Sequence, residues 1–490
     1  MSFDRYRDII PDWPAFRSAV STPERPTLRV RVGTTDREAL AARLQDQGFR
    51  LLAIEGLADF FRVDDGPDSV AQTLEHWLGL FHVQQAVMAI PSLALSPRPG
   101  EAVLDLCAAP GGKTAHLAEL MADRGPLVAV DPKEKRLRGL LGNLYRLGHP
   151  NVLVVAADGR TLPEGASFDR VLVDAPCSAE GNVRRQGGRS PNRTPGFVRH
   201  VTSLQETLLR RGIRLTRPGG LAVYSTCTFA PEENEAVLDR VIRSEPVRIE
   251  KIPLSLPHDP GLDEWDGSTF HPDVRKAWRV YPHHLDSGGL FVARLRRLSD
   301  EGGAVPPLEE TPSAPLPGWS PVPAAFPGES EADADARLRN ARSELRDRYG
   351  LPASLLDSLG WIVRKENIWA HTAGHWPVDA WSEPGREGRW RVVSLGIRAL
   401  RRGAHGHETP SSHFLSRWGD ALAPERRVEL PPEALRRLLD GEHLPAGDLP
   451  TGPVALVWEG IVVGRGMVGR RGLSHEIARA YAERLRTILA

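Results

Sequence analysis

The stretch that decides the fold runs from Val103 to Leu120 and reads VLDLCAAPGGKTAHLAEL. An apolar run, a glycine-rich turn and a helical segment follow one another within it. Such a turn lets the backbone approach a ligand closely and points the N-terminal amides of the helix at it. The turn matches neither GxGxxG nor the phosphate-binding pattern GxxxxGK followed by Ser or Thr, which disfavours a nucleoside triphosphate site.

Similar apolar runs recur from residue 101 to about 230, and helical segments such as 133–148 and 201–216 separate them. The runs are EAVLDLC, PLVAVD, NVLVVAAD, FDRVLVDAP and GGLAVYSTC. Each is bounded by Gly, Pro or Asp and lacks the polar alternation of a strand with one face in water. Repeated units of this kind predict a parallel, doubly wound sheet, so we expect an α/β fold with a Rossmann-like core.

The chain has 490 residues, enough for several domains of roughly 100–200 residues each. We expect a small α/β cap over 1–95 and the catalytic domain over 96–300. Eight prolines fall within 301–328, so residues 301–335 are predicted to form a Pro-rich, acidic linker. An α+β region is expected over 336–420, and a β-rich piece closed by a helix over 421–490.

The overall charge is balanced, with 63 Lys and Arg against 63 Asp and Glu, which argues against a polybasic protein. The local distribution is uneven, because nine arginines and one acid fall between residues 181 and 220. Such a segment suits nucleic-acid binding, although a solvated helix face accounts for it equally well. The candidate RNA-binding residues are Arg184, Arg185, Arg189 and Arg193.

The polar, charged start MSFDRYRDIIPDW shows no secretory signal. The longest charge-free stretch, His76 to Pro97, contains polar residues and a proline, so a buried helix and loop fit it better than a membrane span. Three cysteines without a CxxC pair exclude a disulfide scaffold and a cysteine-rich zinc site. We therefore expect a cytoplasmic monomer without metal or membrane.

Acidic residues end the next two predicted strands. A carboxylate at Asp131 suits two ribose hydroxyls, as in dinucleotide folds, and one at Asp158 suits an adenine amino group. An acid at a strand end is also a common helix N-cap. A glycine-rich loop followed by two such acids favours an adenosine-bearing ligand, and the missing diphosphate motif points to S-adenosylmethionine.

Two of the three thiols follow neighbouring strands, Cys177 in VDAPCSAEG and Cys227 in YSTCTFAPE. Ligands of an open α/β sheet bind outside the carboxyl ends of the strands, so both thiols should face one substrate beside the cofactor. Cys107 lies in the first strand-to-loop transition, where a small buried residue or a backbone contact is the expected role.

Methylation at carbon 5 of a pyrimidine is chemistry that needs a thiol. That carbon is too weak a nucleophile until a thiolate adds at carbon 6 and turns the ring into an enamine. A cysteine with a pKa of about 8.5 needs a nearby cation or helix terminus to ionise at neutral pH. Asp174 is placed to hydrogen-bond the N3/N4 edge of the base.

At these residues the chain resembles the RNA (cytosine-5)-methyltransferase family of RsmB/NOP type, specifically its bacterial RsmF-like ribosomal RNA branch. The matching motifs are LDLCAAPGGKT (104–114), DAPCS (174–178) and STCT (225–228). The resemblance implies that Cys227 is the nucleophile, that Cys177 assists product release, and that Lys113 lies at the floor of the site. The S-adenosylmethionine contacts that it implies are Cys107, Ala108, Ala109, Pro110, Gly111, Gly112, Lys113, Asp131, Asp158 and Asp174.

The resemblance covers most of the chain, with some departures. Ala179 replaces the more usual glycine of the first cysteine loop, and Arg31 stands where the family usually has asparagine. The C-terminal piece around WEGIVVGRGMVGRRGLSH is similar to a PUA-like RNA-binding β-barrel, in which the Arg465–Arg471 cluster suits phosphate contact.

The resemblance implies S-adenosylmethionine-dependent formation of 5-methylcytidine in 16S ribosomal RNA or the small ribosomal subunit. A tRNA cytosine-5 methyltransferase and a non-catalytic RNA-binding ribosome assembly factor are the alternatives. A DNA cytosine methyltransferase would use the thiol of the Pro-Cys motif as nucleophile and leave Cys227 without a role.

Overall fold

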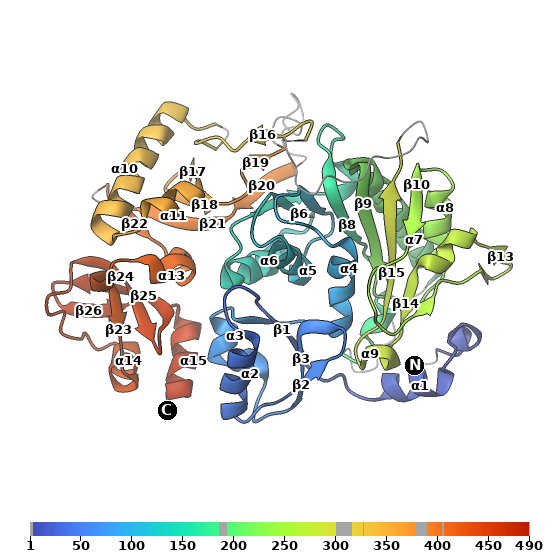
Figure 1. The fold of residues 1–490 in the computed structure, drawn as a ribbon, viewed down its shortest axis with the longest axis horizontal. Coiled ribbons are helices and arrows are strands. Elements are labelled where there is room, and N and C mark those ends of the chain that lie inside the picture. The colour runs from blue at the N-terminus through green and yellow to red at the C-terminus, as the bar shows by residue number, and fades with distance from the viewer. Residues whose placement is uncertain are drawn as a thin grey trace.

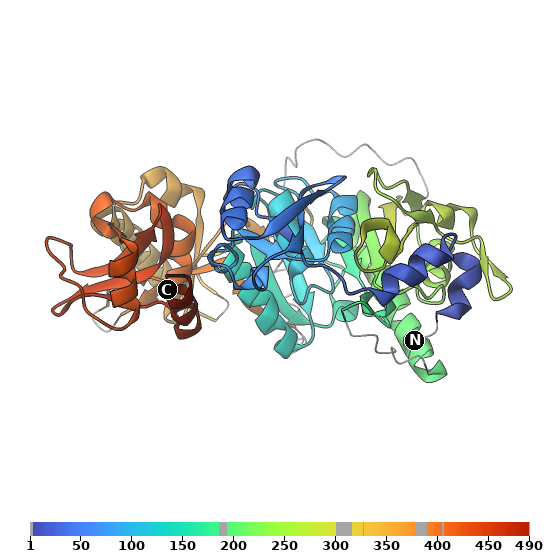
Figure 2. The same cartoon turned by 90° about the horizontal axis from the view of Figure 1, so that it is seen from below.

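A computed structural model describes residues 3–185, 194–299, 316–326, 328–377, 390–403 and 406–489. The chain is extended along one axis, with the C-terminal region at one end and helix α1 (Trp13–Ser21) at the other (Figures 1 and 2). The catalytic region expected from the sequence lies between them (Figure 1).

A mixed sheet of ten strands forms the centre of the protein. Its parallel part has the order β9-β8-β5-β6-β7 and confirms the predicted Rossmann-like core. The strands are β5 (Val103–Asp105), β6 (Leu127–Asp131), β7 (Val152–Ala157), β8 (Phe168–Asp174) and β9 (Thr216–Thr226). The strand order reverses between β5 and β8, which is where such sheets bind their ligands.

Helices cover both faces of this sheet, which explains the continuous apolar runs. Leu104 belongs to the core beneath α7 (Pro195–Leu215) and α8 (Glu235–Ile242). Val103 belongs to the core beneath α5 (Gly112–Leu120) and α6 (Glu134–Leu147). Consecutive residues of β5 point into different cores, so both must be apolar, and the strand lacks the alternation of apolar and polar residues.

Antiparallel strands extend the sheet at both edges. β15 (Leu290–Arg297) pairs with β9, and β14 (Trp278–Val280), β11 (Asp259–Pro260) and β10 (Val247–Glu250) complete that side. On the other side β20 (Trp390–Leu395) pairs with β7, with Val392 opposite Val155. The sequence assigned this strand to a separate C-terminal region, but it satisfies the backbone groups of an edge that would otherwise stay open.

Part of the predicted linker packs on the core. The Trp319 indole lies edge-on to Phe168, with ring centroids 5.2 Å apart, and its Nε1 donates to the Ser167 carbonyl at 2.8 Å. Gly318 has a φ of +81°, and a Cβ there would lie 1.9 Å from the Gly165 carbonyl oxygen. Residues 301–315 lie outside the described ranges. A segment predicted to be a linker therefore contributes Trp319 to the core of the catalytic region.

The N-terminal residues divide between two places. A four-stranded antiparallel sheet consists of β1 (Thr27–Val30), β2 (Arg50–Ile54), β3 (Leu57–Asp65) and β4 (Phe81–Val83), with α2 (Arg37–Asp46) against it. Helix α1 lies away from this sheet and packs on α9 (Pro282–Leu285) at the far side of the catalytic region (Figure 1). The predicted cap is thus a sheet with a separate N-terminal strap.

The C-terminal half contains two further sheets. One consists of β17 (Gly360–Arg364), β18 (Asn367–His371), β21 (Ile397–Arg402) and β22 (Glu408–Pro410), next to α10 (Glu331–Tyr349). The other consists of β23 (Arg427–Glu429), β24 (Gly452–Trp458), β25 (Ile461–Gly469) and β26 (Gly472–His475), with α14 (Pro432–Leu439) and α15 (Arg479–Leu489). Its PUA-like character stays a prediction, as do the domain boundaries.

Helix α15 of the C-terminal region packs against α3 of the N-terminal region. The Tyr481 ring stacks on Trp77 of α3 (Leu74–Trp77), with centroids 5.4 Å apart. No helix in the described ranges combines the length and apolarity that a membrane crossing requires.

We expect Trp319→Ala to lower the free energy of unfolding by about 3 kcal/mol, because it removes a buried aromatic side chain and a hydrogen bond. Urea unfolding followed by fluorescence or circular dichroism measures the change. Val32→Ala, at a side chain that is 58% exposed, is the matched control and should change stability by under about 0.5 kcal/mol. Equal effects of the two substitutions would contradict the packing of this segment on the core.

Candidate active site

A cavity of about 680 Å³ lies at the carboxyl ends of β5, β8 and β9. Its size is that of small-molecule sites in general. The N-terminal sheet contributes His82, Gln84 and Gln85 to the wall, and sequence reasoning singled out none of these three. The predicted site residues that line the cavity are Cys107, Ala108, Ala109, Pro110, Gly111, Gly112, Lys113, Asp174, Cys177, Arg185 and Cys227.

The glycine-rich loop lies tightly against α6. Gly111 has a φ of +104°, and a Cβ there would lie 2.7 Å from Leu140 Cδ1. Glycine is therefore required both by the backbone conformation and by the neighbouring helix. Helix α5 begins directly afterwards at Gly112, so its N-terminal turn borders the cavity.

Asp105, the last residue of β5, is a site residue that the sequence reasoning missed. Thr114 Oγ1 donates to its Oδ2 at 2.7 Å, while Oδ1 is buried without a hydrogen-bond partner in the described part of the chain. Burial raises the pKa of this carboxyl to about 7, and the Thr114 hydrogen bond opposes that rise. An ammonium donor reaching Oδ1 would satisfy the orphaned oxygen and favour its ionised form.

The two acids expected to bind adenosine lie outside the cavity lining. Asp131 is buried, accepts from the Lys133 amide at 2.9 Å and pairs with Arg136 at 2.8 Å. Arg136 itself lines the cavity. Asp158 caps a short 3-10 turn and accepts from Arg160, as the N-cap alternative expects. Their contacts with a cofactor stay predictions.

The two strand-end thiols meet at the cavity. Cys177 Sγ lies 3.3 Å from Cys227 Sγ, and the Asn182 side-chain amide donates to Cys227 Sγ at 3.3 Å. The hydrogen bond from Cys177 lowers the pKa of Cys227 against the effect of burial, with Lys113 adding to the fall. The same contact, together with burial, raises the pKa of Cys177 well above its usual range. Of the two thiols, Cys227 is therefore the one that loses its proton more readily.

Cys107, the third thiol, also lines the cavity, but burial raises its pKa well above the ordinary value. A protonated thiol is a poor nucleophile. The backbone or packing role of Cys107 stays a prediction.

Lys113 and Asp174 form a partly buried ion pair beside the thiols. Lys113 Nζ donates to Asp174 Oδ2 at 2.7 Å, and Ser225 Oγ donates to Oδ1 at 2.8 Å. Burial lowers the pKa of Lys113, but Asp174 outweighs it and the net pKa is raised. Lys113 therefore stays charged and orients the Asp174 carboxylate toward the cavity.

A polar network ties the loop after β8 to the loop after β9. Ser178 Oγ and Thr228 Oγ1 lie 2.7 Å apart. The Glu180 carboxylate accepts from Thr228 Oγ1, the Phe229 amide and the Tyr6 hydroxyl at 2.9, 3.2 and 2.8 Å. Tyr6 belongs to the N-terminal strap, so the first residues of the chain support the loop that carries Cys227.

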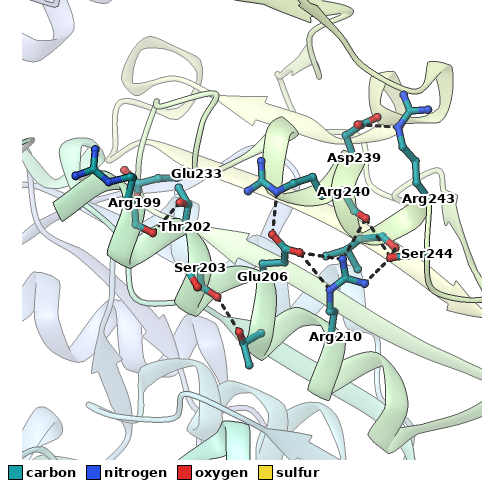
Figure 3. Close-up of polar contacts among 12 residues, drawn as sticks. Arg199, Thr202, Ser203, Glu206, Arg210, Glu233, Asp239, Arg240, Arg243 and Ser244 are labelled. Carbon is teal, nitrogen blue, oxygen red and sulfur yellow. Dashed lines mark hydrogen bonds and ion pairs between the residues drawn. The ribbon is translucent and has the colours of Figure 1, made fainter. Parts of the chain in front are cut away.

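Most arginines of the predicted cationic segment are paired inside the protein. Arg210 binds Glu206 within α7, and Arg240 of α8 binds the same carboxylate from the neighbouring helix (Figure 3). Arg184 is a correction to the RNA-binding prediction, because its side chain is 2% exposed and pairs with Asp286 at 2.7 Å. The other paired arginines of the segment are Arg211, Arg214 and Arg217.

Two predicted RNA contacts, Arg189 and Arg193, lie outside the described residues. Arg185 is exposed and lines the cavity, as a phosphate contact requires. In the C-terminal cluster Arg465 pairs with Glu476 at 2.9 Å, while Arg470 and Arg471 are exposed at the turn between β25 and β26.

Comparison with known proteins gives a consistent result. The family profile described as "16S rRNA methyltransferase RsmB/F" matches residues 92–296. The tRNA (cytosine(49)-C(5))-methyltransferase of Pyrococcus abyssi is 37% identical over 227 residues, 46% of this chain and 73% of that protein. Ribosomal RNA small subunit methyltransferase F of Vibrio vulnificus is 28% identical over 464 residues, 90% of this chain and 89% of that protein. Among solved structures, a methyltransferase homolog from Pyrococcus horikoshii aligns with a TM-score of 0.54 and 33% identity, over 60% of this chain and 94% of that chain.

The proximity of the two thiols predicts their oxidation product. We expect one equivalent of hydrogen peroxide to convert Cys177 and Cys227 to a disulfide with release of two water molecules, and dithiothreitol to reverse it. Mass spectrometry of non-reduced peptides should find the cross-linked pair two hydrogens lighter, with Cys107 unmodified. Sulfinic acid at Cys227 beside a free Cys177 thiol would contradict the geometry.

Proposed function

This chain belongs to the RsmB/F family of RNA cytosine-C5 methyltransferases, and from that premise we propose that it methylates carbon 5 of cytidine in 16S ribosomal RNA. The substrate assignment is supported by the relative named ribosomal RNA small subunit methyltransferase F, which is similar over nine-tenths of both chains. The observation that carries the chemistry is the contact of two thiols with opposite pKa shifts beside the cavity.

S-adenosylmethionine fits the donor set around the glycine-rich loop, and when bound it supplies a methyl group on a positively charged sulfur. Asp105 Oδ1 is a buried acceptor without a partner among the described residues, and it suits the amino group of the methionyl part. The backbone of 107–113 would border the cofactor, and Asp131 would accept from the ribose after Arg136 turns away. Asp158 remains the candidate for the adenine amino group.

Cys227 is the nucleophile in this proposal. Its thiolate forms a bond to carbon 6, and the displaced π electrons make carbon 5 nucleophilic enough to take the methyl group. Loss of the proton from carbon 5 and β-elimination then break the carbon–sulfur bond and return the thiolate. The lowered pKa of Cys227 favours the attacking form at neutral pH.

Cys177, Asp174 and Lys113 support that sequence of steps. Cys177 keeps its proton and donates to the neighbouring sulfur, so it is placed to assist the release of Cys227 from the methylated base. Asp174, which accepts a hydrogen bond from Lys113, would face the N3/N4 edge of the pyrimidine. Its carboxylate accepts a hydrogen bond from the N4 amino group, or from a ring protonated at N3.

The target cytidine must leave its stack to reach a cavity at the sheet edge. Arg185 would hold the flanking backbone at the cavity, together with Arg189 and Arg193. The exposed Arg470 and Arg471 would contact RNA at a distance from the cavity, on the C-terminal sheet.

A tRNA substrate is the second candidate, because the similarity to the Pyrococcus abyssi tRNA enzyme reaches 37% identity over 227 residues. The non-catalytic assembly factor is the third. Bisulfite sequencing of ribosomal and transfer RNA from a deletion strain separates them. Loss of 5-methylcytidine from 16S RNA supports the proposal, loss from tRNA supports the second candidate, and loss from neither supports the third.

We expect Cys227→Ala to abolish transfer of a labelled methyl group from S-adenosylmethionine while RNA binding stays within about twofold. Cys177→Ala should instead accumulate a protein–RNA adduct, because addition still occurs while release is impaired. Filter binding, methyl incorporation and denaturing gel electrophoresis measure the three quantities. Methylation by Cys227→Ala, or no denaturant-resistant adduct with Cys177→Ala in the presence of cofactor, would contradict the division of roles.

Arg185→Ala should weaken RNA binding about equally for all sequences and lower the slope of log K against log salt by about 1. The physical reason is the loss of one phosphate contact and its released counterion. Arg243→Ala is the matched control, because Arg243 is paired with Asp239 at 2.8 Å on the outer side of α8. A salt slope unchanged by Arg185→Ala would place the RNA backbone elsewhere.

A further inference from the structure

The sulfur of Cys227 has a second hydrogen-bond donor besides Cys177. Asn182 Nδ2 lies 3.3 Å from Cys227 Sγ, and both residues line the cavity. We propose that Asn182 is a positioning residue that holds the Cys227 sulfur in its ionised, attacking orientation by donating an amide hydrogen bond to it. The proposal deepens the proposed function and rests on Cys227 as the nucleophile.

The backbone places this amide directly against Cys227. Asn182 ends the short 3-10 turn Glu180–Asn182, and the amide of Gly181 donates to the Cys227 carbonyl at 2.9 Å. The backbone amide of Asn182 donates to the Ala179 carbonyl at 3.1 Å, which closes the turn. Ala179 adopts a left-handed φ of +59°, a conformation that non-glycine residues rarely take.

Further contacts fix the turn on its other sides. Gly289 donates to the Gly181 carbonyl at 3.0 Å, and a Cβ on Gly181 would lie 2.4 Å from the Gly289 carbonyl oxygen. The Glu180 carboxylate binds Thr228 and Phe229, the two residues after Cys227. The separation of the Asn182 amide and the sulfur is therefore determined by backbone and carboxylate contacts on both loops.

The charged groups that face Cys227 explain why the Asn182 amide matters for the thiolate. Cys177 donates to the sulfur, Lys113 attracts its negative charge, and Asp174 repels it. Lys113 is itself paired with Asp174 at 2.7 Å, so its attraction is largely offset. Asn182 is an uncharged donor, and its hydrogen bond favours the thiolate form of Cys227. Unlike Lys113, it is not paired with a carboxylate among the described residues that would cancel this effect.

The same hydrogen bond affects both the formation and the breaking of the carbon–sulfur bond, because the thiolate is present before the first and after the second. It stabilises the thiolate before the carbon 6–sulfur bond forms, and it weakens when the sulfur becomes a neutral thioether. On β-elimination the charge returns to the sulfur and the amide again stabilises it. A loss at Asn182 should therefore slow release, and it should slow attack at pH values where most of the Cys227 thiol is protonated.

The test uses the full-length protein with Asn182→Ala and the isosteric Asn182→Asp, each checked for thermal stability. We expect the acidic limb of the kcat/KM–pH profile to move up by about one pH unit in Asn182→Ala and further in Asn182→Asp. This corresponds to a roughly tenfold loss at pH 7 that is recovered near pH 9. Alkylation of Cys227 by iodoacetamide, followed by peptide mass spectrometry, should slow by a similar factor at pH 7.

Asn340→Ala, at an exposed asparagine of α10, is the matched control and should change neither quantity. A loss of activity that is equal at every pH, with unchanged alkylation, would overturn the proposal in favour of a purely structural role. A raised KM for RNA alone, with unchanged alkylation, would overturn it in favour of contact with the RNA. Slower alkylation in a protein whose wild type forms no 5-methylcytidine would refute the proposed function while leaving the role of Asn182 at the sulfur intact.

Discussion

The parallel pairing of β8 with β9 is the constraint on which the site depends. Asp174 lies opposite Ser225 in this register, and Ser225 Oγ donates to the Asp174 carboxylate at 2.8 Å. Cys177 follows three residues after one partner and Cys227 two residues after the other, so the thiols emerge at the same sheet edge, 3.3 Å apart. A slip of one residue would turn the side chains of β9 to the opposite face and separate the two sulfurs.

What the sequence could predict is local or periodic. The five parallel strands, the glycine-rich turn at Gly111 and the two strand-end thiols each follow from short patterns whose spacing carries a physical reason. What it could not predict depends on partners distant in the chain. Edge strand β20 joins β7 across more than 230 residues of sequence, and Trp319 packs on Phe168 from a segment whose composition resembles a linker. Such contacts produce no periodic pattern in the sequence. Composition therefore placed β20 in the C-terminal region and Trp319 in a linker, and neither segment could be linked to the central sheet.

The arginine-rich segment shows the same limit in its electrostatics. Counting charges between 181 and 220 found a cationic stretch, but apart from Glu206 the acids that pair with it come from other parts of the chain: Glu164, Asp169, Glu245 and Asp286. Strand-end acids were ambiguous for a related reason. Asp158 caps its own turn, so its position at a strand end does not make it a ligand-binding residue. Asp105 was overlooked, although its buried Oδ1 has no hydrogen-bond partner in the described part of the chain and is the better-defined acceptor. The residue type gave the chemistry in each case, and only the surroundings decided its use.

The asymmetry between the two thiols follows from those surroundings. Two thiolates 3.3 Å apart would repel strongly in a buried site, so the pair retains one proton between them. Glu233 faces Cys177 and disfavours a negative charge there, while Lys113 and the Asn182 amide face Cys227 and favour one. The proton therefore stays on Cys177, which becomes a hydrogen-bond donor to its neighbour. Asp174 opposes the charge on Cys227 and largely offsets Lys113, so the assignment of nucleophile and release group depends on the contact between the sulfurs together with Glu233 and the Asn182 amide.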